Sequence, residues 1–220
     1  MNEEPLIRWD WIGRNIPDIA GYLGENMLLA LVPVVLGLIM ALPLGLISVR
    51  WRRLFPPVLT TTSILYAIPS LALFMLFINI TGLTYWTVMI PLSLFSLSVL
   101  VPNVVDGLNS VPMPVRQAAE AMGFGGLRRL LQVELPIAVP VIIAGLRVAT
   151  VSNISMVSVG AIMGMGGLGY YFTDGLQRDF ATPIFVGIVL IVALAFLADG
   201  VLLIAQRVLT PWSRSREGAA

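Results

Sequence analysis

Histidine, cysteine and lysine are absent from this sequence of 220 residues, and all 13 basic residues are arginine. Without cysteine and histidine there is no thiol nucleophile, no histidine general base and no usual set of zinc ligands. Without lysine there is no Ser/Lys dyad and no G-x-x-x-x-G-K-[ST] loop for binding a nucleotide. The sequence therefore predicts no catalytic residue and no metal site.

Charge is also scarce, since 11% of the residues are charged and 58% are hydrophobic. An apolar run of about 20 residues is long enough to cross a bilayer as a helix. Residues 26–49, 54–105 and 180–198 carry no charge, and residues 135–162 carry only Arg147. We therefore predict an all-α polytopic membrane protein with five transmembrane helices, at roughly 27–49, 57–80, 85–105, 136–160 and 182–205.

The placement of arginine predicts the orientation, because cytoplasmic loops carry an excess of basic residues. Nine arginines would lie on one side of the membrane, namely Arg50, Arg52, Arg53, Arg116, Arg128, Arg129, Arg207, Arg214 and Arg216. Three would lie on the other side, namely Arg8, Arg14 and Arg178. The N-terminus is therefore predicted outside and the C-terminus in the cytoplasm. Residues 1–25 are expected to form an extracytoplasmic amphipathic segment, and residues 208–220 a cytoplasmic tail.

One predicted cytoplasmic segment, residues 116–136, interrupts the apolar runs with three arginines and two glutamates. Pro112 and Pro114 before it favour a helix start, and Gly123 is typical of a helix end. The 3, 4 and 7 spacing of four apolar residues predicts one helix face, formed by Val115, Ala118, Ala119 and Met122. A turn at Gly125 and Gly126 and a second short apolar face should follow, formed by Leu127, Leu130 and Leu131. Pro136 fits the first turn of the fourth span. Periodicity alone is equally typical of an ordinary interfacial loop.

The same segment resembles the EAA loop of ABC importer permeases. The match consists of Ala118-Ala119, three residues, Gly123, nine residues, and then Val133-Glu134-Leu135-Pro136. This chain has Gln117 in place of the family's glutamate and Val133 in place of its isoleucine. The resemblance implies the type I ABC importer (MetI-like) permease fold, with a transmembrane permease domain over residues 26–207 and a cytoplasmic coupling loop over 108–135.

The resemblance also implies partners and a division of labour. Two permease subunits form the path, two ATPase subunits bind ATP and Mg²⁺, and an extracytoplasmic binding protein delivers the substrate. The chain would lie in the cell membrane of a prokaryote as a multi-pass subunit, without being an enzyme or binding nucleic acid. Whether its permease partner is identical or merely related stays open. The implied ATPase-coupling residues are Val115, Gln117, Ala118, Ala119, Glu120, Met122, Gly123, Leu135 and Pro136.

Three further stretches resemble permeases for quaternary-amine osmoprotectants such as glycine betaine, choline and carnitine. They are residues 66–74 (YAIPSLALF), 134–151 (ELPIAVPVIIAGLRVATV) and 160–176 (GAIMGMGGLGYYFTDGL). The glycine-rich stretch 160–176 is less specific, since methionine importers carry similar ones, and it is also typical of a flexible loop. A permease for methionine or another small amino acid is therefore one alternative. A passive channel or structural membrane subunit is an alternative of another class.

Ionisable and polar groups inside the predicted spans are the remaining candidates. Arg147 and Asp199 lie at similar depths from the inner ends of their spans and could form an intramembrane pair. Hydrogen bonding between helices explains most of the polar residues. The candidates for lining the path are Tyr66, Asn103, Asn153 and Ser155. Cation–π attraction of a quaternary ammonium to Tyr66, Trp86, Tyr170 or Tyr171 is conceivable, although anchoring at the membrane interface explains these aromatic residues better.

Overall fold

The structure is a computed structural model that describes residues 7–213, and over this range it is helical, without strands. The chain divides into two compact units. Unit 1 comprises the residues up to 35, 68–93 and 150–198, and unit 2 comprises 36–67, 94–149 and the residues from 199 on. Arg214 and Arg216, which entered the predicted orientation, lie outside the described residues, as do the ends of the predicted terminal segments.

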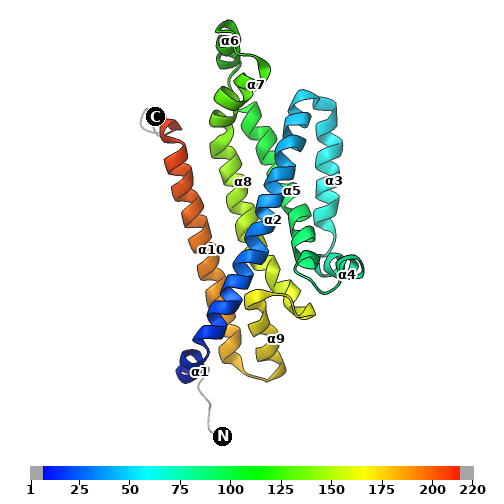
Figure 1. Cartoon of the computed structure of the whole chain (residues 1–220), viewed down its shortest axis with the longest axis vertical. Helices are drawn as coiled ribbons and strands as arrows, with labels where there is room; N and C mark the ends of the chain where they lie inside the picture. The colour runs from blue at the N-terminus through cyan, green and yellow to red at the C-terminus, as the bar shows by residue number, and fades with distance from the viewer. Residues whose placement is uncertain (1–6, 214–220) are drawn as a thin grey trace. The chain divides into compact units, whose positions relative to one another are not determined.

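Ten α-helices are found in the described range, and Figure 1 labels them in chain order. They are α1 (Trp9–Arg14), α2 (Ile16–Arg50), α3 (Phe55–Ala67), α4 (Ser70–Thr81), α5 (Trp86–Asn109), α6 (Met113–Ala121), α7 (Gly126–Arg129), α8 (Leu135–Met156), α9 (Tyr170–Gln177) and α10 (Ala181–Leu209). Short 3₁₀ turns lie at Arg52–Leu54, Val157–Met163, Gly167–Gly169 and Pro211–Ser213, and a π-helical turn lies at Leu130–Glu134.

Prolines occupy the first turns of several helices, where the missing N–H costs no hydrogen bond. Pro17, Pro56, Pro114 and Pro183 all lie at such positions. Four helical segments are long and apolar enough to cross a membrane, namely Ile16–Arg50, Trp86–Asn109, Gly126–Met163 and Ala181–Leu209. Residues 52–67 and 70–81 pass the same test only together, as a bent pair. The described chain therefore has four spans, or five when this pair counts as one.

The second span differs most from its prediction, because residues 57–80 do not form one continuous helix. The helix breaks at Ile68 and Pro69, and α4 starts at Ser70 with Pro69 as its N-cap. Proline disfavours helical geometry in the residue before it and donates no hydrogen bond to the preceding turn. A prediction from uncharged length alone missed this break.

The first span begins earlier than predicted, at Ile16 instead of near residue 27. The backbone N–H of Ile19 donates to the Asn15 carbonyl at 2.9 Å. Pro17 and Asp18 follow in the first turn, where both residue types favour a helix start. Residues 16–25 therefore belong to the long helix, and only the short α1 precedes it in the described part of the predicted amphipathic segment.

The fourth span also starts before its predicted first turn. α7, the π-helical turn and α8 form one continuous run that passes through Pro136. A proline ring inside a helix clashes with the carbonyl of the residue four positions before it, here Gln132. The wider π-helical turn at Leu130–Glu134 accommodates that clash, so Pro136 lies inside the run and not at its start.

Unit 2 is held together by small residues where its helices approach one another closely. An added Cβ at Gly145 of α8 would lie 2.6 Å from the Cβ of Asn103 on α5. An added Cβ at Gly107 of α5 would lie 3.0 Å from the carbonyl oxygen of Ala138 on α8. Small residues at crossings allow backbones to approach, which is how membrane helices gain packing contacts.

Unit 1 contains the glycine-rich stretch, which is packed and not a loose loop. Met165 to Gly169 are all buried. Gly167 has a φ of +48°, and an added Cβ there would lie 2.7 Å from the backbone nitrogen of Asn26 on α2. The glycines of this stretch therefore allow close packing of the backbone.

Candidate functional site

The predicted coupling segment, residues 108–135, begins where α5 ends and contains α6 and α7, which lie side by side in Figure 1. Pro112 is the N-cap of α6, as its position before the helix predicted. α6 ends in a Schellman motif, in which the Phe124 N–H donates to the Ala119 carbonyl at 3.1 Å and the Gly123 N–H donates to the Glu120 carbonyl at 2.9 Å. Gly123 has a φ of +79°, so the chain reverses at the glycine predicted to stop the helix.

A charged network fixes this turn to the rest of unit 2. The Nε atom of Arg129 donates to Oε1 of Glu134 at 2.8 Å, and Nη1 of Arg129 pairs with Glu120 of α6. Arg116 of α6 lies 3.8 Å from the same Glu134 oxygen, and its Nη2 atom donates to the Leu108 carbonyl at 2.5 Å. Because Glu134 is 8% exposed, its bonds are shielded from water and stronger than surface ion pairs.

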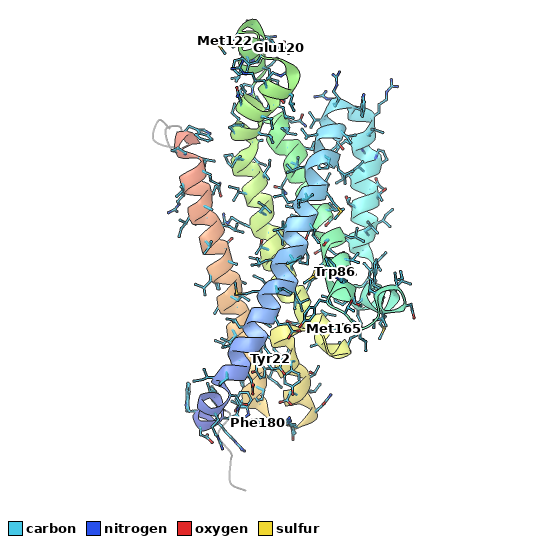
Figure 2. The ribbon with its side chains drawn as sticks, viewed as in Figure 1. Tyr22, Trp86, Glu120, Met122, Met165 and Phe180 are labelled. Carbon is cyan, nitrogen blue, oxygen red and sulfur yellow. The ribbon has the colours of Figure 1, made fainter. Side chains whose placement is uncertain are left out.

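Several apolar residues of the segment are exposed, beside exposed polar residues. Met113 is 63% exposed, Met122 69% and Leu127 71%, and Ala118 and Ala121 are exposed as well. Figure 2 shows Glu120 and Met122 together at the far end of this segment. Exposed apolar patches with polar surroundings are typical of protein contact sites. We call this set of residues the docking surface.

The four residues of the predicted contact face of α6 differ in exposure. Ala118 and Met122 point outward, but Ala119 is 1% exposed and Val115 is half-buried. Successive residues of a helix are rotated by about 100° around its axis, so the four predicted residues include positions on both the buried and the exposed side of α6. Arg116 turns inward to reach Glu134, which places Ala119 beside it against the chain. Ala119 is therefore covered by the chain in this structure, and its coupling role stays a prediction.

The other predicted coupling residues lie at both ends of the segment. Gln117 and Glu120 are exposed on α6. Leu135 and Pro136 are half-buried in the continuous run of α7 and α8, away from the docking surface by sequence position. Among residues 7–213, no group of three acidic residues comes together as a metal site would require.

Arg147 of α8 and Asp199 of α10 form a bidentate ion pair within unit 2. The distances are 2.7 Å from Nε to Oδ1 and 2.8 Å from Nη2 to Oδ2. Their side chains are 30% and 32% exposed, so the pair reaches the surface of this subunit midway along apolar helices. A charged pair at such a place needs protein or water around it, because hydrocarbon solvates charge poorly.

The four candidates for lining the path have different surroundings. Tyr66 is 47% exposed with its ring edge against Phe95, and Ser155 is also exposed. Asn103 is half-buried and donates to the Val99 carbonyl of its own helix at 2.8 Å. Asn153 is 2% exposed and donates to the Ala30 carbonyl of α2 at 3.4 Å, so it packs between helices, and its role in lining the path stays a prediction.

The aromatic residues near the start of α2 pack against one another. Tyr22 stacks on Tyr170 with ring centroids 4.7 Å apart, and Trp11 meets Tyr171 and Phe180 edge to face. Figure 2 shows Tyr22 and Phe180 in the same region of unit 1. Burial raises the pKa of the Tyr171 hydroxyl, so it stays protonated at neutral pH. The cluster anchors α1, α2 and α9 and is filled by its own rings, which favours the structural interpretation over an ammonium site.

Sequence reasoning missed the role of several charged residues. The sequence shows that Arg116, Arg129 and Glu134 are charged residues between apolar runs, but it does not show which residues they pair with. A signal was present, because a glutamate next to an apolar span needs a cation to compensate its burial. Met113 and Leu127 were also missed as surface residues, since apolar residues in a membrane protein are expected in spans first.

Comparison with known proteins gives consistent results. Residues 33–211 match a family model described as the binding-protein-dependent transport system inner membrane component. The chain is 36% identical over 203 residues to the osmoprotectant import permease protein OsmW of Salmonella typhimurium, covering 88% of this chain and 94% of that protein. It is 31% identical over 188 residues to the glycine betaine/carnitine/choline transport system permease protein OpuCB of Bacillus subtilis, covering 86% and 87%.

A solved structure of the MetNI methionine ABC transporter in an inward-facing conformation has a similar fold. The TM-score is 0.76 at 21% identity, covering 87% of this chain and 96% of that one. The predicted MetI-like fold is therefore confirmed. The family model extends from within α2 to the end of α10 and includes the whole coupling segment. This chain belongs to the family of inner membrane components of binding-protein-dependent transport systems.

Proposed function

We propose that this chain is a permease subunit that forms the translocation path for quaternary-amine osmoprotectants such as glycine betaine, choline and carnitine. The observation that carries this proposal is the set of relatives, since permeases named for these solutes are 31–36% identical to this chain over most of its length. The methionine transporter shares the fold at 21% identity, which favours the osmoprotectant over the methionine alternative. The family is described as binding-protein-dependent, which disfavours the alternative that this chain is a passive channel.

The physical chemistry of the path is compatible with such solutes. A trimethylammonium group has no N–H donors, so it needs no buried acceptor along its way. Residues 54–105 contain no acidic residue, so no fixed carboxylate in this stretch would hold the cation and slow its release. The Arg147–Asp199 pair is internally neutralised and leaves no net charge on α8 and α10 at that depth.

Energy would enter through the docking surface of the coupling segment. Met113, Ala118, Met122 and Leu127 offer an apolar contact area to an ATPase partner, which would bind ATP and Mg²⁺. The Schellman turn and the ion pairs of Glu134 would hold α6 firmly, so that a movement of α6 is passed on to α5 and α8. A second permease subunit and an extracytoplasmic binding protein complete the proposed complex. Its place is the cell membrane of a prokaryote.

Uptake by the complete complex in proteoliposomes tests the substrate. Labelled glycine betaine, choline, carnitine and methionine are offered in parallel with the cognate binding protein and internal ATP. We expect ATP-dependent uptake of at least one quaternary amine and none of methionine. Uptake of methionine alone would refute the substrate while leaving the importer intact.

The proposed orientation places the N-terminus outside and the coupling segment in the cytoplasm, following the arginine asymmetry. The natural absence of cysteine makes single-cysteine labelling clean. An Asn2→Cys variant should react with an impermeant maleimide from outside only. Reaction only from the cytoplasmic side would overturn the orientation.

A further inference from the structure

A cavity of about 570 Å³ lies within unit 2, where α2 ends at Arg50. Its lining comes from the last turn of α2, the end of α5, α6 and the run from α7 to α8. Three arginines line it, Arg50, Arg116 and Arg129, together with one carboxylate, Glu134. With three positive charges and one negative charge, the net charge of the lining is +2. Pairing of Glu120 with Arg129 from outside the lining still leaves +1.

The arginines are not all satisfied by the chain. Arg50 is exposed, and its side chain has no hydrogen bond or ion pair within residues 7–213. The Nε atom of Arg116 is buried and lacks a hydrogen-bond partner, because it lies 3.8 Å from Glu134, beyond hydrogen-bond distance. A buried donor without an acceptor is costly, and most such donors in proteins find a partner. The free Arg50 side chain and the net positive charge of the lining point to an anionic acceptor in the cavity.

The rest of the lining is apolar. Leu46 and Val49 come from the last turns of α2, and Leu108 and Leu130 face them from α5 and the π-helical turn. The apolar run of α2 ends at Arg50, which is the level at which a span meets lipid headgroups. Arginines beside leucines at this level match a molecule with a phosphate at one end and apolar chains at the other.

We propose that this cavity binds the phosphate of an anionic phospholipid headgroup. Arg50 and Arg116 supply donors to the phosphate oxygens, while Leu46 and Val49 contact the start of the acyl chains. Arg116 and Arg129 also hold α6 through Glu134, so the bound phosphate shares ligands with the network that supports the docking surface. This inference goes beyond the transported substrate and does not depend on it.

Native mass spectrometry of the complete transporter, released from nanodiscs, tests the proposal. The nanodiscs contain phosphatidylcholine with phosphatidylglycerol as a minor component. We expect the wild type to retain phosphatidylglycerol in preference to phosphatidylcholine. Arg50→Gln should lower this retention several-fold, because it removes a free arginine from the lining without breaking an internal bond. Arg52→Gln, two residues away and outside the lining, is the matched control and should retain the lipid as the wild type does.

A second arm separates the lipid from soluble phosphate. Radiolabelled inorganic phosphate is equilibrated with the delipidated complex in neutral detergent. Binding of inorganic phosphate that is sensitive to Arg50→Gln, without preference for phosphatidylglycerol, would overturn the lipid assignment. Equal loss of phosphatidylglycerol in Arg50→Gln and Arg52→Gln would overturn the cavity, since a general surface charge would then explain retention. The uptake assay is independent of this lipid-binding test. A negative result for the lipid would therefore not contradict the proposed substrate.

Discussion

At the scale of single residues, Gly123 shows how a backbone angle alone can set the geometry of a site. Both Gly123 and Gly125 have open space where a Cβ would be added, but only Gly123 has a positive φ, of +79°. Gly123→Ala should therefore cost about 1 kcal/mol in the left-handed region and misdirect the end of α6. We expect it to lower substrate-stimulated ATPase activity and uptake in proteoliposomes. Gly125→Ala is the matched control, and equal effects of the two changes would contradict the role of the turn.

The Arg147–Asp199 pair makes a second prediction at this scale. Removing one partner leaves a charge among apolar helices, so each single change to alanine should lower the melting temperature in detergent. The double change should cost less than the sum of the two single changes, because it leaves neither charge without its partner. The Arg14–Asp10 pair of α1, whose side chains are 75% and 70% exposed, is the control, and its coupling should be smaller. Strict additivity at Arg147 and Asp199 would show that their contact does not stabilise the subunit.

At the scale of helices and loops, the uncharged runs predicted the spans well, while their interruptions were harder to predict. The C-terminal ends of α2, α5 and α10 lie within a few residues of their predicted positions because apolar length sets them, whereas α2 and the run into α8 start well before theirs. The break at Ile68 and Pro69 and the π-helical turn before Pro136 were missed, although both prolines were in view. A proline can begin, bend or end a helix, and only packing around it decides which.

The glycine-rich stretch yields a prediction about packing. Gly164 and Gly167 both have positive φ, +77° and +48°, but an added Cβ meets nothing within 4 Å at Gly164 and the Asn26 backbone at 2.7 Å at Gly167. Gly164→Ala should cost only about 1 kcal/mol of backbone strain. Gly167→Ala must also displace α2, so we expect little monodisperse protein after solubilisation, measured by size-exclusion chromatography. Equal yields of both variants would contradict the close packing.

At the scale of the whole molecule, the family could be predicted from the sequence, and the coupling role of residues 108–135 stays a prediction, whereas the exposure of these residues could not be predicted. The spacing from Ala118 to Pro136 identifies the segment regardless of how it folds. Which side of α6 faces the chain depends on Arg116 reaching Glu134, a contact between residues 18 positions apart. Periodicity predicts that a helix has an apolar side. In α6, small residues occupy both the buried and the exposed side, so the spacing does not show which residues are exposed.

The central claim is that an ATPase partner drives this permease through the outward surface of α6. Single cysteines at adjacent positions test it directly, because the native chain has none. Ala118→Cys should react with maleimide in the isolated permease and become protected when the ATPase partner assembles on it. Ala119→Cys, which is buried within the chain, should stay unreactive in both states. Labelling of Ala118→Cys at the same rate with and without the bound ATPase would contradict the claim.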